Sequence, residues 1–406
     1  MSPGPARLAA LAAFLLLAGC ASQPAGGPDQ PFRPGQLPEG SRADVAILET
    51  TDLDAHILGY DYQEQKADPT LGFERTVTLI RRARDQFTNT FLFDDGDAIQ
   101  GTALADYQAR VKPLPCDQEL AMYRAMDAVG YDGGTLGSHD FDYGLTFLSQ
   151  VTGTPMDVDG VPVQHCAGPH YPLVLANVVS TRDGKPIFKP WTIIHRQIAA
   201  YTPDGSQLSV PLKVAIIGFT APPTTPLDPE GRVTVTGVVA TAEKYLPQIE
   251  AQHPDLVIAL LHGGLDTSPY TPAMENGGWY LAGVHGIDVL LLGRMHAHFP
   301  GPRFAHMQDV DDVNGFVRGV PAVMGGFFGK DLGVVKLALA WSHGHWTIDQ
   351  PLTHSRVWPI CSKPGDDASC VPADPAIAPL LDEVQKATMA YLDTPTRRSQ
   401  PQTPGR

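Results

Sequence analysis

The feature of this sequence that most limits its fold is a series of short apolar runs, each followed by a polar residue. The runs read "VAILETTD", "TFLFDDGD", "DLVIALLH" and "IDVLLLGRMH", and a further apolar run reads "KVAIIGFT". Each has the length of a buried strand, and helix-like segments such as residues 74–87 and 117–129 lie between them. Buried strands that alternate with helices predict an α/β fold.

The polar residues at the ends of these runs predict a ligand site. Asp52, Asp97 and His262 follow three of the runs, and Arg294 and His296 follow the fourth. In an α/β fold, ligands bind beyond the carboxyl ends of the strands, where such side chains meet. A mixture of Asp and His suits a divalent metal ion. Each residue alone has a simpler interpretation as a solvated strand end or a helix N-cap, so the prediction rests on the set.

The N-terminus has the pattern of an export signal. Arg7 precedes an apolar run over residues 8–17, which is shorter than a membrane-spanning helix. The sequence "LAGC" resembles the lipobox of bacterial lipoproteins, which implies cleavage before Cys20 and lipidation of that residue. An ordinary secretory signal is the alternative. We expect a lipoprotein signal peptide over residues 1–20 and a lipid-anchored protein on the periplasmic side of the envelope, with the outer membrane favoured.

Composition divides the remaining chain into three parts. Residues 21–42 are rich in Pro, Gly and Gln and predict a flexible tether. Residues 43–392 predict a single domain. The sequence "DPAIAPLLDEVQKATMAYLDT", which begins at residue 374, predicts an amphipathic helix, and residues 393–406 predict a disordered tail.

Charge excludes one class of partner. The net charge is −15 and basic residues do not cluster, so a nucleic acid polymer is not expected to bind. A small phosphorylated substrate is compatible with this charge because a metal ion can supply the positive charge.

Four cysteines follow the signal segment, and they allow three disulfide pairings. Cys361 and Cys370 bracket the turn-rich segment "SKPGDDAS", which favours their pairing and leaves Cys116 with Cys166.

Several motifs in order resemble one family. "ILETTDLDAHILGYDY", "LFDDGDAIQGTALADY", "TLGSHDFDYGLTFL", "LLGRMHAHFPG" and "GVPAVMGGFFGKDLGVVKL" are similar to the metallophosphoesterase domain of periplasmic nucleotidases. The most similar type is the 2′,3′-cyclic-nucleotide 2′-phosphodiesterase/3′-nucleotidase. The resemblance covers residues 44–390 and implies a four-layer α/β/β/α sandwich of the calcineurin-like class. The family also carries a C-terminal domain that stacks the nucleotide base, and we expect base recognition of that kind to be missing here.

The resemblance also implies a metal centre with changed ligands. The positions of the family's first ion are occupied by Asp52, Asp54, Asp97 and His296, with Asp54 in place of a histidine. The positions of the second ion are occupied by Asp97, Ser138, His262 and Arg294, with Ser138 in place of an asparagine and Arg294 in place of a histidine. The family's transition-state histidine and its orienting aspartate correspond to His139 and Asp142.

These changes predict a cofactor of one divalent ion. Ser138 is a weak neutral ligand, and the protonated guanidinium of Arg294 cannot bind a metal. The ion is expected to be Mn²⁺, Mg²⁺ or Zn²⁺, and the carboxylates favour the first two.

Two interpretations of Arg294 lead to two functions. In the first, Arg294 contacts a phosphate oxygen in place of the second ion, with His139 and Asp142 as catalytic partners. The protein is then a metal-dependent phosphoesterase that hydrolyses phosphomonoesters or cyclic phosphodiesters such as small nucleotides. In the second, Arg294 pairs with Asp54 or Asp97 and fills an emptied site. The protein is then an inactive relative that acts as a binding or scaffold lipoprotein.

Two further histidines leave the ligand set open. His56 and His298 repeat the family's ligand spacing two residues downstream of the aligned positions. A shift of two residues keeps the side chains on the same face of a strand. Without that shift, both histidines are expected at the cleft or its rim. Phe327 and Phe328 either flank the cleft or belong to the core.

Overall fold

The computed structural model describes residue 1 and residues 37–394. The predicted signal peptide with Cys20, the tether up to residue 36 and the tail from residue 395 lie outside the described residues, apart from Met1. Leu37 is buried, and the backbone N–H of Gly40 donates to the carbonyl oxygen of Trp341 at 2.9 Å. The chain is therefore packed against the domain from residue 37, a few residues before the predicted start at residue 43.

Strand β1 (Arg42–Thr50) lies in the middle of one half of a large mixed sheet. It runs parallel to β4 (Thr90–Asp94) and antiparallel to β16 (Asp331–Ser342). This half is completed by β5 (Gly133–Gly134), β17 (His345–Ile348) and β18 (His354–Pro359). Because side chains alternate along a strand, β1 buries apolar residues on both faces of the sheet.

The other half of the sheet is mostly parallel. Its parallel strands, in order, are β8 (Gln207–Thr220), β10 (Leu256–His262), β11 (Val289–Leu292) and β15 (Val320–Gly325). Strand β7 (Trp191–Tyr201) forms a hairpin with β8 and joins β1 at the pair Arg42 and Tyr201. Short strands at the far edge are β12 (His298–Phe299), β13 (Val310–Asp311) and β14 (Phe316–Val317).

The two halves pack face to face. Val45 and Ile47 of β1 share one apolar cluster with Ile258 of β10 and Leu291 of β11, and all four side chains are fully buried. Burial of this interface removes apolar surface from water. Each Å² of apolar surface buried stabilises the folded state by about 25 cal/mol, so the interface is a main source of stability.

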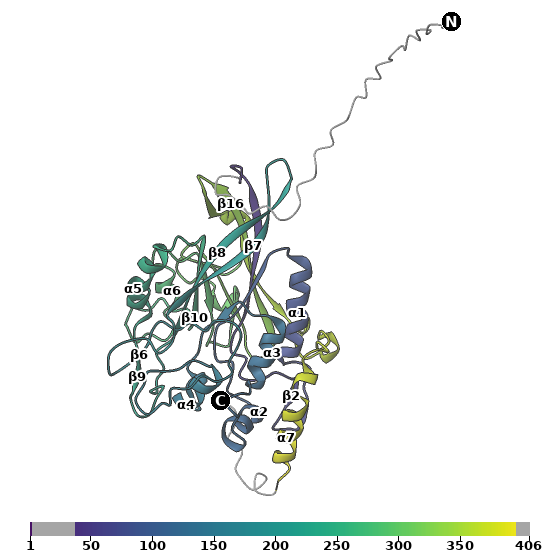
Figure 1. The fold of residues 1–406 in the computed structure, drawn as a ribbon, viewed down its shortest axis with the longest axis vertical. Helices are drawn as coiled ribbons and strands as arrows, with labels where there is room; N and C mark the ends of the chain where they lie inside the picture. Colours follow the sequence, from purple (N-terminus) through teal and green to yellow (C-terminus); the bar gives the residue numbers. More distant parts are fainter. Residues whose placement is uncertain (2–36, 395–406) are drawn as a thin grey trace.

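Helices cover the two outer faces, as Figure 1 shows. On the β1 side, Ala46 and Leu48 share a cluster with residues of α1 (Phe73–Gln86) and α3 (Ala121–Val129). On the β10 side, the outer cluster includes residues of α5 (Val238–Glu250) and α6 (Gly278–Leu281). The predicted four-layer α/β/β/α sandwich is confirmed.

Two predicted helices begin later than expected. Helix α3 was predicted to start at residue 117 but starts at Ala121, because Leu120 has extended backbone geometry (φ −60°, ψ 140°). At the C-terminus, Pro379 lies in a short 3₁₀ turn (Ala378–Leu380), and α7 (Asp382–Leu392) begins only after it. Proline lacks an N–H and clashes with the preceding turn, so a continuous helix from residue 374 does not form.

The remaining elements are short. The short helical segments are α2 (Ala103–Asp106), a π-helical turn (Tyr107–Val111), α4 (Leu145–Val151) and 3₁₀ turns at Gln350–Leu352 and Asp367–Ser369. Two small antiparallel ribbons pair β2 (Tyr60–Asp61) with β3 (Lys66–Ala67) and β6 (Val178–Ser180) with β9 (Val233–Val235). Disulfides join Cys116 to Cys166 and Cys361 to Cys370, which is the pairing favoured from the sequence. Within residues 37–394, no helix has both the length and the apolar character needed to cross a bilayer.

Candidate metal centre and cleft

The carboxyl ends of β1, β4 and β10 bring three predicted ligands together. Asp52 follows β1, Asp97 follows β4 and His262 ends β10, and all three side chains are buried. Asp52 and Asp97 have left-handed backbone geometry, with φ of 49° and 54°. This conformation is uncommon for residues other than glycine. Backbone hydrogen bonds hold the two loops in register, from Asp52 N–H to the Gly96 carbonyl (3.0 Å) and from Asp54 N–H to the Asp97 carbonyl (2.8 Å).

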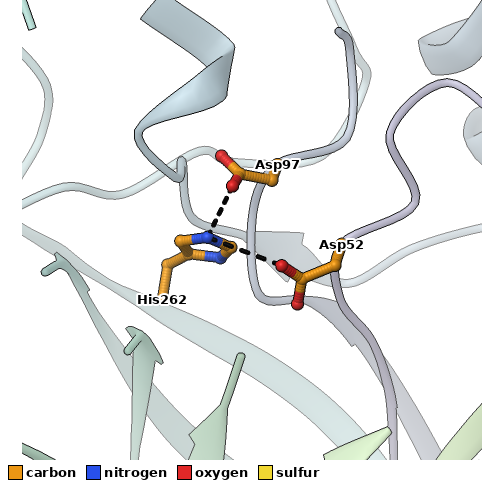
Figure 2. Close-up of side chains that lie close together, drawn as sticks. All are labelled: Asp52, Asp97 and His262. Carbon is orange, nitrogen blue, oxygen red and sulfur yellow. Dashed lines mark ion pairs between the residues drawn. The ribbon is translucent and has the colours of Figure 1, made fainter. Parts of the chain in front are cut away.

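The ligand atoms of Asp52, Asp97 and His262 all lie within 4.8 Å of one another. Figure 2 shows the His262 ring between the two carboxylates, with Nε2 at 2.7 Å from Asp97 Oδ2 and 3.8 Å from Asp52 Oδ1. His262 Nδ1 lies 2.8 Å from the carbonyl oxygen of Asp95, which can only accept, so Nδ1 carries the proton and Nε2 is the atom that can bind a metal. The family resemblance assigned His262 and Asp52 to different ions, whereas the structure places both in one group.

This group fits a divalent cation. Asp52 Oδ1 is buried and has no hydrogen-bond partner among the described residues. A buried carboxylate oxygen without a partner is costly unless a cation or donor meets it. Burial alone would raise the pKa of Asp97, but His262 and the N–H of His139 lower it to about 2. Burial alone would lower the pKa of His262, but Asp97 and Asp52 raise it to about 10, so a cation that binds Nε2 has to displace a proton from it. Two carboxylates and an imidazole are an ordinary donor set for Mn²⁺ or Zn²⁺.

Half-exposed His296 and buried Asp54 lie beside this group. His296 Nε2 is 3.4 Å from Asp52 Oδ1 and 3.8 Å from Asp54 Oδ2. Burial, with the charges of Asp97 and Asp52, raises the pKa of Asp54 well above its ordinary value. The His296 ring stacks on Phe327, with ring centres 4.6 Å apart and planes at 7°. Both residues can therefore join the ligand set, as the resemblance implied.

Arg294 does not pair with Asp54 or Asp97. Its Nε donates to Glu275 Oε1 at 2.8 Å, its Nη2 contacts the same oxygen, and its Nη1 donates to Ser138 Oγ at 2.6 Å. The ion pair with Asp54 or Asp97 that belonged to the second interpretation of Arg294 does not form, since the partner carboxylate is Glu275. Glu275 follows no apolar strand run, so the sequence carried no signal for it. Ser138, a predicted ligand position, is the acceptor for the guanidinium.

His139 and Asp142 form a second pair in the cleft. His139 Nδ1 lies 3.0 Å from Asp142 Oδ2, and the His139 side chain is half exposed. The hydrogen bond to Asp142 raises the pKa of His139. The backbone N–H of His139 donates to Asp97 Oδ1 at 2.7 Å, which ties this histidine to the ligand group.

Asp140 is a supporting residue that the sequence analysis missed. It is fully buried and accepts hydrogen bonds from four backbone N–H groups, those of Asp97, Ala98, Ile99 and Gly137, at 2.8–3.1 Å. These bonds fix the loop that carries Asp97 against the turn that carries His139. The motif "GSHD", in which Asp140 follows His139 directly, was the available signal.

His56 and His298 lie apart from the ligand group, so the two-residue shift does not occur. The His56 ring stacks on Phe328 at 4.1 Å, and burial lowers the pKa of His56 to about 4. His298 Nε2 lies 2.9 Å from Asp331 Oδ2, and this hydrogen bond raises the pKa of His298.

A cleft of about 540 Å³ opens over the ligand group. The candidate site residues that line it are Asp52, Asp97, Ser138, His139, Asp142, Arg294 and His296. The rest of its lining consists of residues 223–227, Glu275, Asn276, Met295 and Arg303. The volume is within the range of small-molecule sites, about 300–1,000 Å³.

Comparison with known proteins gives a consistent set of relatives. The chain is 36% identical over 328 residues to a 2′,3′-cyclic-nucleotide 2′-phosphodiesterase/3′-nucleotidase from Yersinia enterocolitica, covering 80% of the chain and 47% of the relative. It is 34% identical over 360 residues to the protein of the same name from Salmonella typhimurium (strain LT2), covering 88% of the chain and 52% of the relative. The chain thus spans about half the length of the curated relatives it matches.

A solved structure agrees with these sequence relatives. The calcineurin-like phosphoesterase YfkN from Bacillus subtilis superposes with a TM-score of 0.76 at 28% identity, covering 87% of this chain and all of that one. No protein-family model matches the sequence.

Proposed function

This chain belongs to the calcineurin-like phosphoesterases and is homologous to the 2′,3′-cyclic-nucleotide 2′-phosphodiesterase/3′-nucleotidases; on this premise we propose that its cleft hydrolyses phosphate esters of small nucleotides with a divalent cation. The observation that carries the proposal is the buried group of Asp52, Asp97 and His262, with ligand atoms within 4.8 Å, in the same cleft as His139. Asp52 Oδ1 in this group is buried and has no hydrogen-bond partner among the described residues, which supports a cation at this place.

Asp52, Asp97 and His262 hold the cation in this proposal, with His296 and Asp54 beside them. When bound, a divalent ion supplies positive charge to phosphoryl oxygens and lowers the pKa of a water molecule. Fixed backbone hydrogen bonds to Asp140 and between the two strand-end loops keep these side chains in place.

His139 acts as the proton donor. Because the hydrogen bond to Asp142 raises its pKa, His139 keeps its proton to higher pH and can give it to the leaving oxygen of the ester. Arg294 lines the same cleft. Two of its nitrogens, Nε and Nη2, donate to Glu275, and Nη1 donates to Ser138. Its remaining N–H groups donate to a phosphoryl oxygen and offset its negative charge.

We propose one tightly bound cation per chain. The guanidinium of Arg294 is positively charged. This charge opposes protonation of the His262 imidazole, so it acts to lower the pKa of His262. Ser138 Oγ already accepts from Arg294, so it offers little to a second ion. The carboxylate-rich group favours Mn²⁺ or Mg²⁺.

One observation favours a second function, a binding or scaffold module without catalysis. Hydrogen bonds join Arg294 to Glu275 and to Ser138, so protein groups alone can hold its guanidinium. An inactive relative would keep such a network but would have no need of the group of Asp52, Asp97 and His262.

The test is a metal and activity assay on the full chain purified in detergent. We expect bound metal, and turnover of bis-p-nitrophenyl phosphate and 2′,3′-cyclic AMP that depends on Mn²⁺. Replacing His139 by Ala should lower kcat by about 10²–10⁴-fold, which is the usual contribution of a general acid. Absence of metal and of turnover, with no effect of the His139 substitution, would favour the binding module.

We also propose that the protein is anchored by lipid at Cys20 on the periplasmic side of the envelope, preferably at the outer membrane. The support is the lipobox-like "LAGC" sequence. A Cys20→Ser variant should lose the incorporation of labelled fatty acid and move from the membrane to the soluble fraction. Membrane retention of this variant without label would overturn the anchor.

A further inference from the structure

Arg303 is a charged residue of the cleft that the proposed reaction does not use. Its side chain is exposed and lines the cleft, and within residues 37–394 it has neither an ion pair nor a hydrogen bond. The other charged groups of the cleft have partners. Arg294 pairs with Glu275, His139 with Asp142, and Asp97 with His262.

The backbone that carries Arg303 is anchored. Arg303 lies in a short 3₁₀ turn (Pro302–Phe304) that follows β12, and β12 pairs with β15 of the sheet. Phe304 is buried and packs edge-on against Phe299, with ring centres 5.3 Å apart. The guanidinium therefore extends from a fixed turn, and only its own side chain needs to be ordered when a ligand binds.

The lining of the cleft is suited to charge and hydrogen bonds more than to stacking. No Phe, Tyr or Trp side chain is among the described residues that line it, and Asn276 lines it together with Arg303. Asn276 accepts from the N–H of Gly264 at 3.1 Å, and its amide nitrogen has no acceptor among residues 37–394. The lining therefore offers an arginine and an amide as donors.

The Arg303 side chain is exposed, in contrast to the buried groups that a reacting phosphoryl group would meet. The reacting group meets the buried ligands Asp52 and Asp97 and the guanidinium of Arg294, which is only 17% exposed. The cleft of about 540 Å³ has room for more than one phosphate group. In a chain with a net charge of −15, an unpaired guanidinium at this place offers one of the few favourable positions for a second anion.

We propose that Arg303, with Asn276, forms a second anion subsite, and that the cleft prefers substrates with a second phosphate group apart from the one that is hydrolysed. The inference rests on the proposed function, because it names the substrate class of the same site. Arginine binds phosphate through two parallel N–H donors, so this contact selects a phosphate more strongly than a hydroxyl.

The experiment compares two probes and three proteins. The probes are adenosine 3′-monophosphate and adenosine 3′,5′-bisphosphate, with release of the 3′-phosphate measured in each case. The proteins are the full chain, Arg303→Gln and Arg82→Gln. Arg82 is a matched control because it is exposed on α1, lies outside the cleft lining and carries the same charge.

We expect the full chain to have the higher kcat/KM for the bisphosphate. Arg303→Gln should lower that value by about tenfold or more, mainly through KM, and change the monophosphate value by less than about twofold. Arg82→Gln should change neither value. Equal losses for both probes would mean that Arg303 contacts or steers the reacting phosphate, and no loss would mean that it binds no substrate; either result overturns the subsite.

Absence of turnover with both probes would contradict the proposed function and not the subsite. Calorimetric titration of the same proteins with adenosine 3′,5′-bisphosphate then decides the matter. Weaker binding by Arg303→Gln than by Arg82→Gln supports the subsite, and equal or absent binding overturns it.

Discussion

Arg294 Nε donates to Glu275 Oε1 at 2.8 Å, and within the described residues no ion pair joins Arg294 to Asp54 or Asp97. The guanidinium is thus held by Glu275 and Ser138, and not by the carboxylates of Asp54 or Asp97. In the proposed centre, the Glu275 carboxylate offsets the charge of Arg294, so that a cation can bind to Asp52, Asp97 and His262 close by.

Replacing Glu275 by Gln should weaken metal binding. The Arg294 charge loses its partner and then opposes the cation, which should lower Mn²⁺ affinity by about three- to tenfold. Because Glu275 is 41% exposed, the loss of the pair should cost about 1 kcal/mol or less of unfolding free energy. Calorimetric titration with Mn²⁺ and a thermal melt measure the two effects. Unchanged affinity would show that Glu275 does not shield the cation from Arg294.

The double change Arg294→His with Ser138→Asn restores neutral ligands at the second position. Two Mn²⁺ ions per chain are then expected, since the fixed cation is removed and two metal-binding side chains are added. Metal content after dialysis gives the number. If the double variant still binds a single ion, the guanidinium is not what limits the centre to one.

Phe327 should support metal binding through His296, because the two rings stack at 4.6 Å and His296 is 40% exposed. Phe327→Leu should lower Mn²⁺ affinity by about tenfold, the lower end of the usual effect of residues that orient a ligand. Phe87→Leu is the control, because Phe87 also stacks on a ring, that of Trp358, in another part of the molecule. An equal loss of affinity in both variants would point to general destabilisation.

Asp228 should make the stability of the cleft wall depend on pH. It is buried, directly follows the wall residue Leu227 and accepts from Arg232 N–H, Nε and Nη2 at 2.8–3.0 Å. The hydrogen bond from the Arg232 side chain lowers the pKa of Asp228 below its ordinary value of 3.8. A lowered pKa in the folded state means that the stabilisation is present above pH 3.8 and is lost as the pH falls through the folded-state pKa.

Asp228→Asn should therefore cost about 1–3 kcal/mol of unfolding free energy near neutral pH, because donors of Arg232 lose a charged acceptor. The difference from the unaltered chain should shrink below pH 3.8. Urea unfolding at neutral pH and at acidic pH measures it. A difference that stays constant with pH would show that the Asp228 charge contributes nothing to stability.

Sequence patterns were enough for the residues that follow strands. Asp52, Asp97 and His262 each come after a buried apolar run, so their meeting at one sheet edge follows from the α/β architecture. Glu275 and Arg303 lie on loops, and their approach to the site depends on how those loops fold back over the sheet. No local spacing encodes that path, and this is why Glu275 was not among the partners considered for Arg294.

Helix ends show the same limit. The run from residue 374 has helical spacing, but Pro379 interrupts it, and α7 begins only at Asp382. A pattern of residue types also could not predict that Asp140 accepts hydrogen bonds from four backbone N–H groups. Its position next to His139 was the one signal that could have indicated a role for it.

The measurement that tests the central claim most directly is the Mn²⁺ stoichiometry of the purified full chain and of its Asp97→Asn variant, by calorimetric titration. The account predicts one ion per chain, with that binding lost or weakened by at least about a hundredfold in the variant, because a charged ligand at the centre of the group becomes neutral. Absence of Mn²⁺ binding by the unaltered chain, or equal binding by both proteins, would contradict it.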